Sequence, residues 1–332
     1  MSERDDWNRS RFQSGDAGGH YESWFQRANH PTRPQAFWIR YTIFSPKGRP
    51  LDAVGELWAV YFDGEAQRIT AVKQVVPISE CRFAEHGLDQ KIGSAHLGRD
   101  SLTGQAIGQG QRIGWNLHYT SPRPPLLLLP ERLYTAPLPK AKSLVGSPLA
   151  EYSGTLDIND QRVNVADWVG SQNHNWGSKH TDRYAWGQVC GFDGAPDIFL
   201  EVATARVRLG PVWTPQMTIM VLRLGSEELL LNSVAQSVRA SASYDYFWWR
   251  FESAHKGISV AGSMAAPGEA FIGLPYGNPP GGVKTCLNSK IASCHLTLRR
   301  PGKAPLSLVS RHRAAFEILT DARDHGVPVL AA

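Results

Sequence analysis

Polar and aromatic side chains that could carry chemistry are concentrated in one stretch of the chain. Residues 167–177 read Asp-Trp-Val-Gly-Ser-Gln-Asn-His-Asn-Trp-Gly, and residues 184–187 follow as Tyr-Ala-Trp-Gly. A packed core has little use for Gln-Asn-His-Asn in succession, because every buried polar group needs a hydrogen-bond partner. The composition therefore indicates a polar cluster at a cavity. A long hydrogen-bonded turn is the structural alternative.

A second candidate is the carboxylate of Glu22, which lies between Tyr21 and the pair Trp24-Phe25. A carboxyl group in apolar surroundings has a raised pKa and can act as a general acid. Equally, Glu22 could form a structural ion pair with Arg27 or Arg40. His174 and His180 are six residues apart with no third ligand at metal-binding spacing, so no metal site is predicted.

The elements that must position these residues are mainly β-strands. Residues 37–44 and 57–62 are rich in β-branched and aromatic side chains, and Asp63-Gly64 predicts a tight turn into a strand over 68–76. Residues 113–119 and 152–158 alternate with the two-residue period of a half-buried strand. The second half of the chain continues in this style, with strands expected over 184–192, 198–209, 217–224, 244–253, 257–265 and 293–299.

Helical signals are scarce. Only residues 313–323, followed by Gly326, combine good helix formers with a stop signal, so a short C-terminal helix is predicted there. So many strands need closed sheets to remove their edges. We predict an all-β protein with a flexible arm over 1–17, one antiparallel barrel over 18–168 and a second over 169–326.

Two short motifs resemble a known family. Glu22-Ser23-Trp24-Phe25 is similar to the Glu-Trp-Trp-Tyr signature of the AttH/carotenoid 1,2-hydratase (hydroxyneurosporene synthase) group, and His174-Asn175-Trp176-Gly177 is similar to its Asp-His-x-Trp-Gly signature. The resemblance covers residues 18 to 325. It implies two lipocalin-like (calycin-type) β-barrels, an apolar small-molecule ligand and chemistry without a redox cofactor.

The chain departs from this family at one position. The hydratases carry an acidic residue before the histidine, whereas this chain has Asn173, which has no acidic proton to donate. The sequence leaves open which carboxylate replaces it. The candidates are Glu22, Asp167, Asp182 and Glu201.

The resulting hypothesis is a cofactor-free enzyme that acts on an isoprenoid- or polyketide-like molecule as a hydratase, cyclase or isomerase. Such chemistry needs an acid in a dry pocket and aromatic faces that stabilise positive charge. We expect an apolar pocket near the junction of the two barrels. The predicted catalytic residues are His174, Asn173 and Glu22, and the predicted substrate-binding residues are Trp24, Gln172, Asn175, Trp176, Tyr184 and Trp186.

The alternative is a non-catalytic, lipocalin-like carrier of an apolar metabolite, and a third option is a module that binds membranes or proteins.

The composition excludes one class of partner. The chain has 35 basic and 30 acidic residues and no basic stripe, which argues against nucleic-acid binding. No segment resembles a signal peptide or a membrane span. The four cysteines lack CxxC spacing, so a cytoplasmic protein with reduced thiols is expected. The oligomeric state is not indicated.

Overall fold

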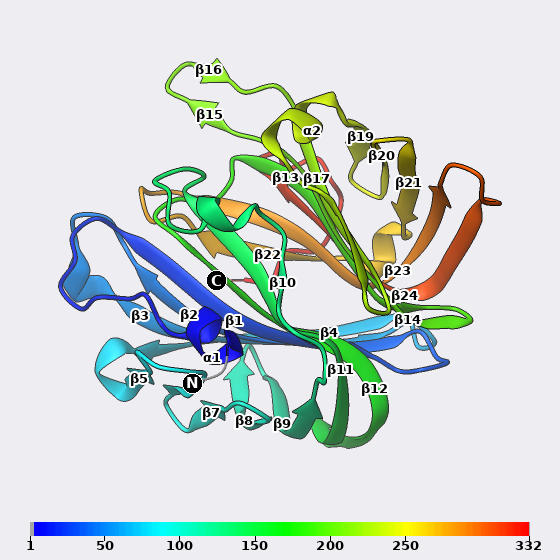
Figure 1. Ribbon diagram of the computed structural model, residues 1–332. Coiled ribbons are helices and arrows are strands. Elements are labelled where there is room, and N and C mark those ends of the chain that lie inside the picture. The colour runs from blue at the N-terminus through cyan, green and yellow to red at the C-terminus, as the bar shows by residue number, and fades with distance from the viewer. Residues whose placement is uncertain (1–2, 332) are drawn as a thin grey trace.

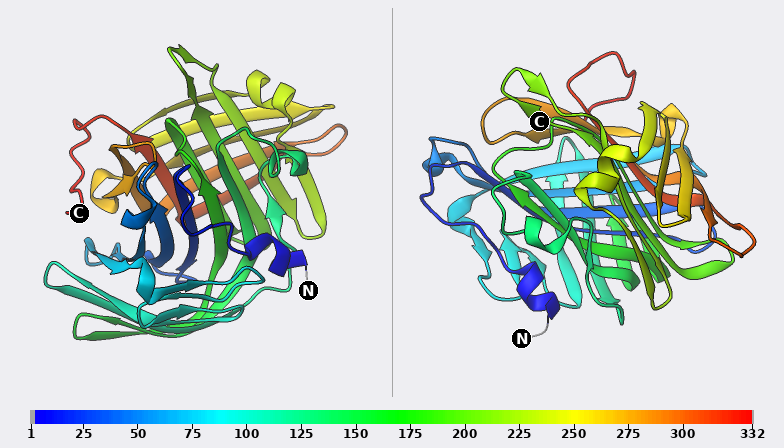
Figure 2. Two further views of the ribbon diagram at one scale, coloured as in Figure 1. Left: turned by 90° about the vertical axis from the view of Figure 1, so that its left-hand side faces the viewer. Right: turned by 45° about the horizontal axis from the view of Figure 1, so that its top comes forward.

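Strands dominate the computed structural model, which describes residues 3–331. Figure 1 shows two curved antiparallel sheets stacked one above the other, and Figure 2 shows from two further sides that their long strands face each other. This confirms the predicted all-β class. Within the described residues the first sheet has 12 strands and the second has 10.

The first sheet follows the N-terminal helix α1 (Glu3–Asn8) and curls into a nearly closed barrel. Its first meander packs back onto the far strands, where the backbone N–H of Ile107 donates to the side-chain oxygen of Gln74. In sheet order its strands are β4 (Arg68–Pro77), β3 (Val54–Asp63), β2 (Gln35–Ser45), β1 (His20–Asn29), β12 (Gln161–Gly177), β11 (Ala141–Ile158), β9 (Gln111–Thr120), β8 (Ser101–Gly108), β7 (Ala95–Leu97), β6 (Gln90–Ile92) and β5 (Cys81–Phe83), with β10 (Leu126–Leu127) paired to β11.

The second sheet is built in the same way and carries the short helix α2 (Val234–Arg239) beside β17 and β20. In sheet order its strands are β18 (Glu227–Leu231), β17 (Met217–Leu224), β14 (Ala195–Arg206), β13 (Arg183–Phe192), β24 (Leu306–Thr320), β23 (Val283–Arg299), β21 (Ile258–Ala265), β20 (Trp248–His255) and β19 (Ser241–Asp245), with β22 (Ile272–Gly277) paired to β23 and a separate hairpin of β15 (Arg208–Leu209) and β16 (Val212–Trp213).

The three largest apolar clusters of the described residues follow from the alternation of side chains along these strands. One fills the first barrel and includes Trp24, and one fills the second barrel and includes Trp249. The third lies between the sheets and contains Phe25, Trp38 and Trp186. We call this layer the seam: the side chains of β1–β4, β11 and β12 that face those of β13, β14 and β22–β24.

The predicted C-terminal helix over 313–323 is wrong. Residues up to Thr320 belong to β24, which is paired with β13 on one side and β23 on the other. Both faces of this strand are buried, since Phe316 enters the core of the second barrel and Ala315 enters the seam. Two hydrogen-bonded neighbours and burial on both faces outweigh the helix propensity of Ala, Glu and Leu, which amounts to tenths of a kcal/mol per residue.

The two sheets divide the chain between Gly177 and Arg183, whereas the sequence placed the boundary at 168/169. Residues 7–12 lie against the first barrel, with Asn8 buried. Whether residues 1–17 form a flexible arm, and whether each barrel is an independent domain, stay predictions. Among the described residues, no helix is both long and apolar enough to cross a bilayer.

Candidate functional site

Strand β12 divides the predicted site between two faces. Gln172, His174 and Trp176 point toward the first barrel, and Asn173 and Asn175 point into the seam. The side chains of the neighbouring strand β1 are divided between the same two faces. Trp24 pairs with His174 on the barrel face, and Phe25 pairs with Asn173 on the seam face. The single pocket expected from the sequence is therefore two clusters on opposite sides of one sheet.

The barrel-face cluster is organised around Glu22 and His174. The ring nitrogen Nε2 of His174 lies 2.8 Å from the Glu22 carboxylate, and Nδ1 lies 2.9 Å from the carbonyl of Trp7. The backbone N–H of Arg11 donates to both carboxylate oxygens of Glu22, and His20 approaches to 3.0 Å. Both Glu22 and His174 are fully buried beneath residues 7–12.

The predicted aromatic and amide residues on this face hold the same segment in place. Trp24 stacks on His174 at 4.7 Å and donates its indole N–H to the carbonyl of Asn8. The side chains of Gln172 and Asn8 form two reciprocal hydrogen bonds of 2.9 Å. The guanidinium of Arg11 lies 3.6 Å over the Trp176 ring. This face is thus occupied by the protein's own N-terminal segment.

Glu22 is ionised in this environment. Burial alone raises the pKa of this carboxyl group, but hydrogen bonds and charge from His174 and His20 outweigh it and lower the pKa to about 2. Burial also lowers the pKa of His174, against the opposing effect of Glu22. Nε2 of His174 faces the Glu22 carboxylate, and Nδ1 faces the carbonyl of Trp7 and, at 3.5 Å, Nη1 of Arg11. Glu22 is therefore a buried, hydrogen-bonded carboxylate and not a poised acid.

The seam-face cluster links Asn173 to Glu201 of β14. Gln188 of β13 donates from Nε2 to Asn173 Oδ1 and to Glu201 Oε2, both at 2.8 Å. The indole N–H of Trp186 donates to the other oxygen of Glu201 at 2.8 Å. Arg27 of β1 completes the group by donating to Gln188 Oε1 at 3.1 Å. The first and second sheets are thus joined by one buried hydrogen-bond network.

Glu201 is a fully buried carboxyl group with a raised pKa. Burial raises its pKa to about 8, although hydrogen bonds from Trp186 and Gln188 act in the opposite direction. The carboxyl group therefore carries a proton at neutral pH. Both carboxyl oxygens of Glu201 accept N–H hydrogen bonds, Oε1 from Trp186 and Oε2 from Gln188. Of the four carboxylates left open by the sequence, Glu201 is the one with a retained proton.

The other two candidates differ from Glu201. Asp182 accepts from Lys179 and from the backbone of Arg208, and these partners hold its pKa below the ordinary value although burial opposes them. Asp167 is exposed on β12. Neither offers a proton inside the seam.

A second carboxylate in the seam is neutralised by a cation. Lys290 of β23 is fully buried and lies 2.7 Å from Glu317 of β24, which also accepts from Asn288 at 2.9 Å. Tyr184, a predicted substrate-binding residue, donates its hydroxyl to Glu317 at 3.4 Å. The ammonium of Lys290 lies 5.6 Å from the Trp186 ring, so this ion pair and Glu201 border the same indole.

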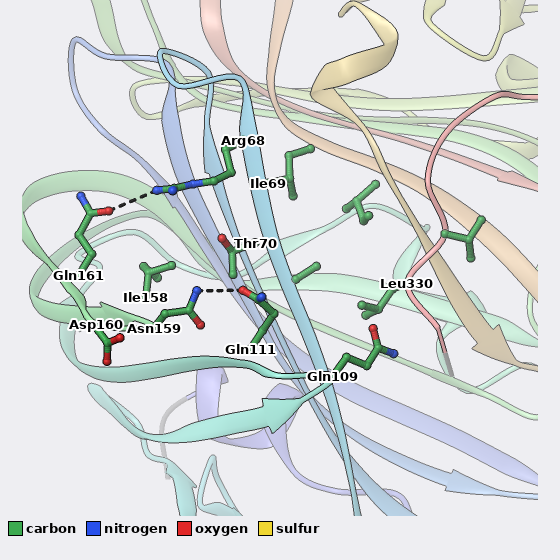
Figure 3. A pocket seen from close by; sticks show the side chains of 13 residues that line it. Arg68, Ile69, Thr70, Gln109, Gln111, Ile158, Asn159, Asp160, Gln161 and Leu330 are labelled. Carbon is green, nitrogen blue, oxygen red and sulfur yellow. Dashed lines mark hydrogen bonds between the residues drawn. The ribbon is translucent and has the colours of Figure 1, made fainter.

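An open cleft of about 860 Å³ lies at the edge of the seam (Figure 3). Its walls come from β4, from the β8–β9 and β11–β12 hairpins, and from the C-terminal segment that carries Leu330. Four cleft residues (Ile69, Ala71, Ile272 and Leu330) also belong to or pack against the apolar cluster of the seam. The volume is within the range of small-molecule sites. The cleft therefore borders the apolar cluster that contains Trp186.

Sequence reasoning missed Gln188, Lys290 and Glu317, and named Glu201 only among alternatives. A usable signal was present. Glu201 interrupts the run Ile-Phe-Leu-Glu-Val, and Glu317 interrupts Ala-Ala-Phe-Glu-Ile-Leu. A single charge within an otherwise apolar strand marks a buried ionisable group, and such groups are candidates for functional sites.

Comparison with solved structures identifies the class of fold. The chain has the fold of AttH-like proteins, in which two lipocalin-like barrels follow each other. A Nitrosomonas europaea protein given the name AttH is similar with a TM-score of 0.58 at 12% identity, over 94% of this chain and 96% of that one. Kievitone hydratase from Nectria haematococca has a TM-score of 0.53 at 11% identity, over 90% and 89% of the two chains.

A third similar structure is CghA, with a TM-score of 0.61 at 13% identity, over 92% of this chain and 89% of that one. No model of a known protein family matches the sequence, and no curated protein does. At these identities the likeness establishes the fold. The activity has to be argued from the side chains of this chain.

Proposed function

We propose that this protein is an enzyme that transfers a proton from Glu201 to an apolar, isoprenoid- or polyketide-like small molecule bound in the seam. The observation that carries the proposal is a fully buried carboxyl group in the seam, held by the N–H donors of Trp186 and Gln188, whose pKa is raised to about 8. Hydration, cyclisation and isomerisation can all start with such a step. One of the similar structures is a hydratase by name.

The surrounding groups suit both states of the acid. Before transfer, the O–H of Glu201 is directed to the substrate. After transfer, the carboxylate keeps the N–H donors of Trp186 and Gln188, and the charge of Arg27 also favours the ionised form. Donors that are fixed in advance stabilise charge without reorganisation. Asn173 acts as a positioning residue, since it holds the amide of Gln188 in the orientation that Glu201 requires.

The excess of buried basic side chains in the seam limits the kinds of reaction step that it can favour. Arg27, Arg40 and Lys290 are buried basic side chains, and the carboxyl group of Glu317 lies 2.7 Å from Lys290. With Glu201 protonated, the layer carries excess positive charge. This favours steps in which negative charge develops on a substrate oxygen over steps that form a free carbocation. A double bond conjugated to a carbonyl group meets this condition. Glu201 protonates the α carbon, the oxygen of a water molecule bonds to the β carbon, and the proton that this water loses returns to the Glu201 carboxylate.

Under this proposal His174 and Glu22 have a structural role. They fasten residues 7–12 to the first barrel, as their contacts with Trp7 and Arg11 indicate. Loss of His174 is then expected to reduce stability and to leave the proton-transfer step intact in the folded fraction.

The test compares wild-type protein with Glu201→Gln and with Glu151→Gln, an exposed glutamate on β11, as the control. Each is incubated in D₂O with a metabolite extract of the organism that makes the protein, and the extract is followed by mass spectrometry. We expect wild type and the control to convert one metabolite to a product with carbon-bound deuterium. Glu201→Gln should still bind the metabolite, as native mass spectra would show. It should convert the metabolite about 10²- to 10⁴-fold more slowly, which is the usual contribution of general acid catalysis to a rate.

Two results would contradict the proposal. Equal turnover by wild type and Glu201→Gln would place the acid elsewhere. A metabolite that binds wild type and is recovered unchanged would show the carrier that the sequence left as the alternative.

A further inference from the structure

Arg40 of β2 is a buried arginine without a carboxylate partner. It is 4% exposed, and among residues 3–331 it forms no ion pair. It donates one side-chain hydrogen bond, from an Nη atom to the hydroxyl of Ser23 at 2.5 Å, and its Nε has no partner. Glu56 and Glu317 influence it only through longer-range charge, because they are paired with Lys73 and Lys290.

Arg27, the other buried arginine of this layer, shows the contrast. Both of its Nη atoms donate, to Gln188, Cys190, Asn29 and the carbonyl of Arg313, although its Nε is also unpartnered. Arg40 makes one side-chain hydrogen bond where Arg27 makes four, so more of its donor capacity is left unused in a buried position.

Further unpartnered polar atoms lie in the strands beside Arg40. The hydroxyl of Thr42, two residues along β2, has no hydrogen-bond partner, and neither has the side-chain oxygen of Asn175. The register places Thr42 opposite Ser23 on β1, and Ser23 opposite Asn175 on β12. Thr42 and Arg40 are on the same face of β2, because side chains alternate along a strand. Unsatisfied donors and an acceptor thus converge on one side of the seam.

The opposite side is aromatic. The guanidinium of Arg40 lies 4.4 Å from the centroid of the Tyr276 ring, and His180 stacks between Tyr21 and Tyr276 at 3.9 and 5.9 Å. Burial and the nearby charge of Arg40 lower the pKa of His180 to about 3, so this ring is neutral and adds no positive charge. The guanidinium of Arg40 is thus flanked by aromatic faces on this side of the seam.

We infer that Arg40, with the hydroxyl of Thr42, binds an anionic oxygen of the substrate, and that the substrate class is therefore an acidic lipophile: an apolar body that carries one carboxylate or enolate. The inference rests on the proposed function in taking the seam as the ligand site. A carboxylate would accept from the free Nε of Arg40 and from Thr42, and its charge would replace the missing ion-pair partner. The apolar body would lie along the cluster that contains Phe25, Trp38 and Trp186.

The experiment uses cis-parinaric acid, a fluorescent polyene carboxylate, and its uncharged methyl ester as probes. Fluorescence titration at neutral pH should show that wild-type protein binds the acid about 10- to 100-fold more tightly than the ester. This ratio corresponds to the free energy of hydrogen bonds to a charged group. Arg40→Met should abolish this preference by weakening the acid and not the ester. Thr42→Val, which removes only an unpartnered hydroxyl, should reduce it about three- to tenfold.

Stability measurements separate binding from folding. Arg40→Met should melt at or above the wild-type temperature without ligand, because it removes an unpaired buried charge. The control is Arg223→Met, which removes a buried arginine paired with Glu228 at 2.6 Å. This control should melt earlier and keep the acid preference.

The inference is overturned if wild type binds acid and ester alike, if it binds neither probe, or if Arg40→Met keeps the preference. Glu201→Gln distinguishes this failure from failure of the proposed function. It should keep the acid preference whether or not turnover depends on Glu201.

Discussion

At the scale of residues, two buried glutamates are held in opposite protonation states. Glu22 accepts N–H groups from Arg11, His20 and His174 and has a pKa near 2, whereas Glu201 accepts only two neutral N–H donors and has a pKa near 8. Pairs of carboxyl groups with divergent environments commonly separate structural and proton-donating roles. Here that separation assigns the acid to the seam and the ionised carboxylate to the barrel face.

The first prediction at this scale concerns stability. Glu22→Gln should lower the free energy of unfolding by about 3–5 kcal/mol at neutral pH, because it removes the buried carboxylate that faces His174, His20 and the backbone N–H of Arg11. The pKa of Glu22 is lowered on folding, so its contribution is present above the ordinary value of 4.5 and is lost as the pH falls toward about 2.

Urea denaturation between these pH values measures the effect, with wild type and variant converging as the solution is acidified. The control is Glu65→Gln, which breaks the exposed pair with Arg33 and should change little. A variant as stable as wild type at neutral pH would contradict a stabilising carboxylate at Glu22.

The sequence identified many of these residues but not their grouping. The motifs around Glu22 and His174 drew attention to β1 and β12, and both residues do meet. What could not be read is which face each residue takes, because residues 171–176 are polar on both sides of the strand. A two-residue period indicates faces only when one side is apolar. For the same reason Asn173 and His174 were assigned to one pocket.

At the scale of elements, strand pairing decided the structure where local signals were ambiguous. The Asp63-Gly64 turn was readable, and its hairpin forms as predicted. The stretch 167–177, interpreted as a polar cluster or a turn, is the second half of β12. Its partners are β1 and β11, which are far away in sequence. Pairing between strands that are far apart in sequence produces no local sequence pattern from which it could be predicted.

Strand β24 provides the prediction at this scale. Residues 314–319 lie between β13 and β23, so their backbone amides should be among the slowest to exchange with deuterium. Native-state hydrogen exchange with mass spectrometry measures this directly. Residues 234–239 of the short helix α2 serve as the internal comparison and should exchange faster. Rapid exchange over 314–319 would instead support the helix that the sequence predicted.

At the scale of the whole molecule, the two barrels meet through a layer that is costly for a purely structural interface. Arg27, Arg40, Lys290, Glu201 and Glu317 are all buried there. Replacing buried charges by apolar side chains of similar volume is often neutral or stabilising, so stability alone does not account for them. Figure 1 places the C-terminus between the two sheets, where Gln109 of the first barrel donates to the carbonyl of Ala331 beside the cleft.

The most direct test is infrared spectroscopy of the carboxyl group of Glu201. The spectrum of Glu201→Gln is subtracted from that of wild type across a pH series, which isolates the carbonyl stretch of this one protonated acid. Because folding raises the pKa of Glu201, the band should be present at neutral pH and should disappear as the pH rises through about 8. A band that is absent at neutral pH and appears only near the ordinary pKa of 4.5 would contradict the account.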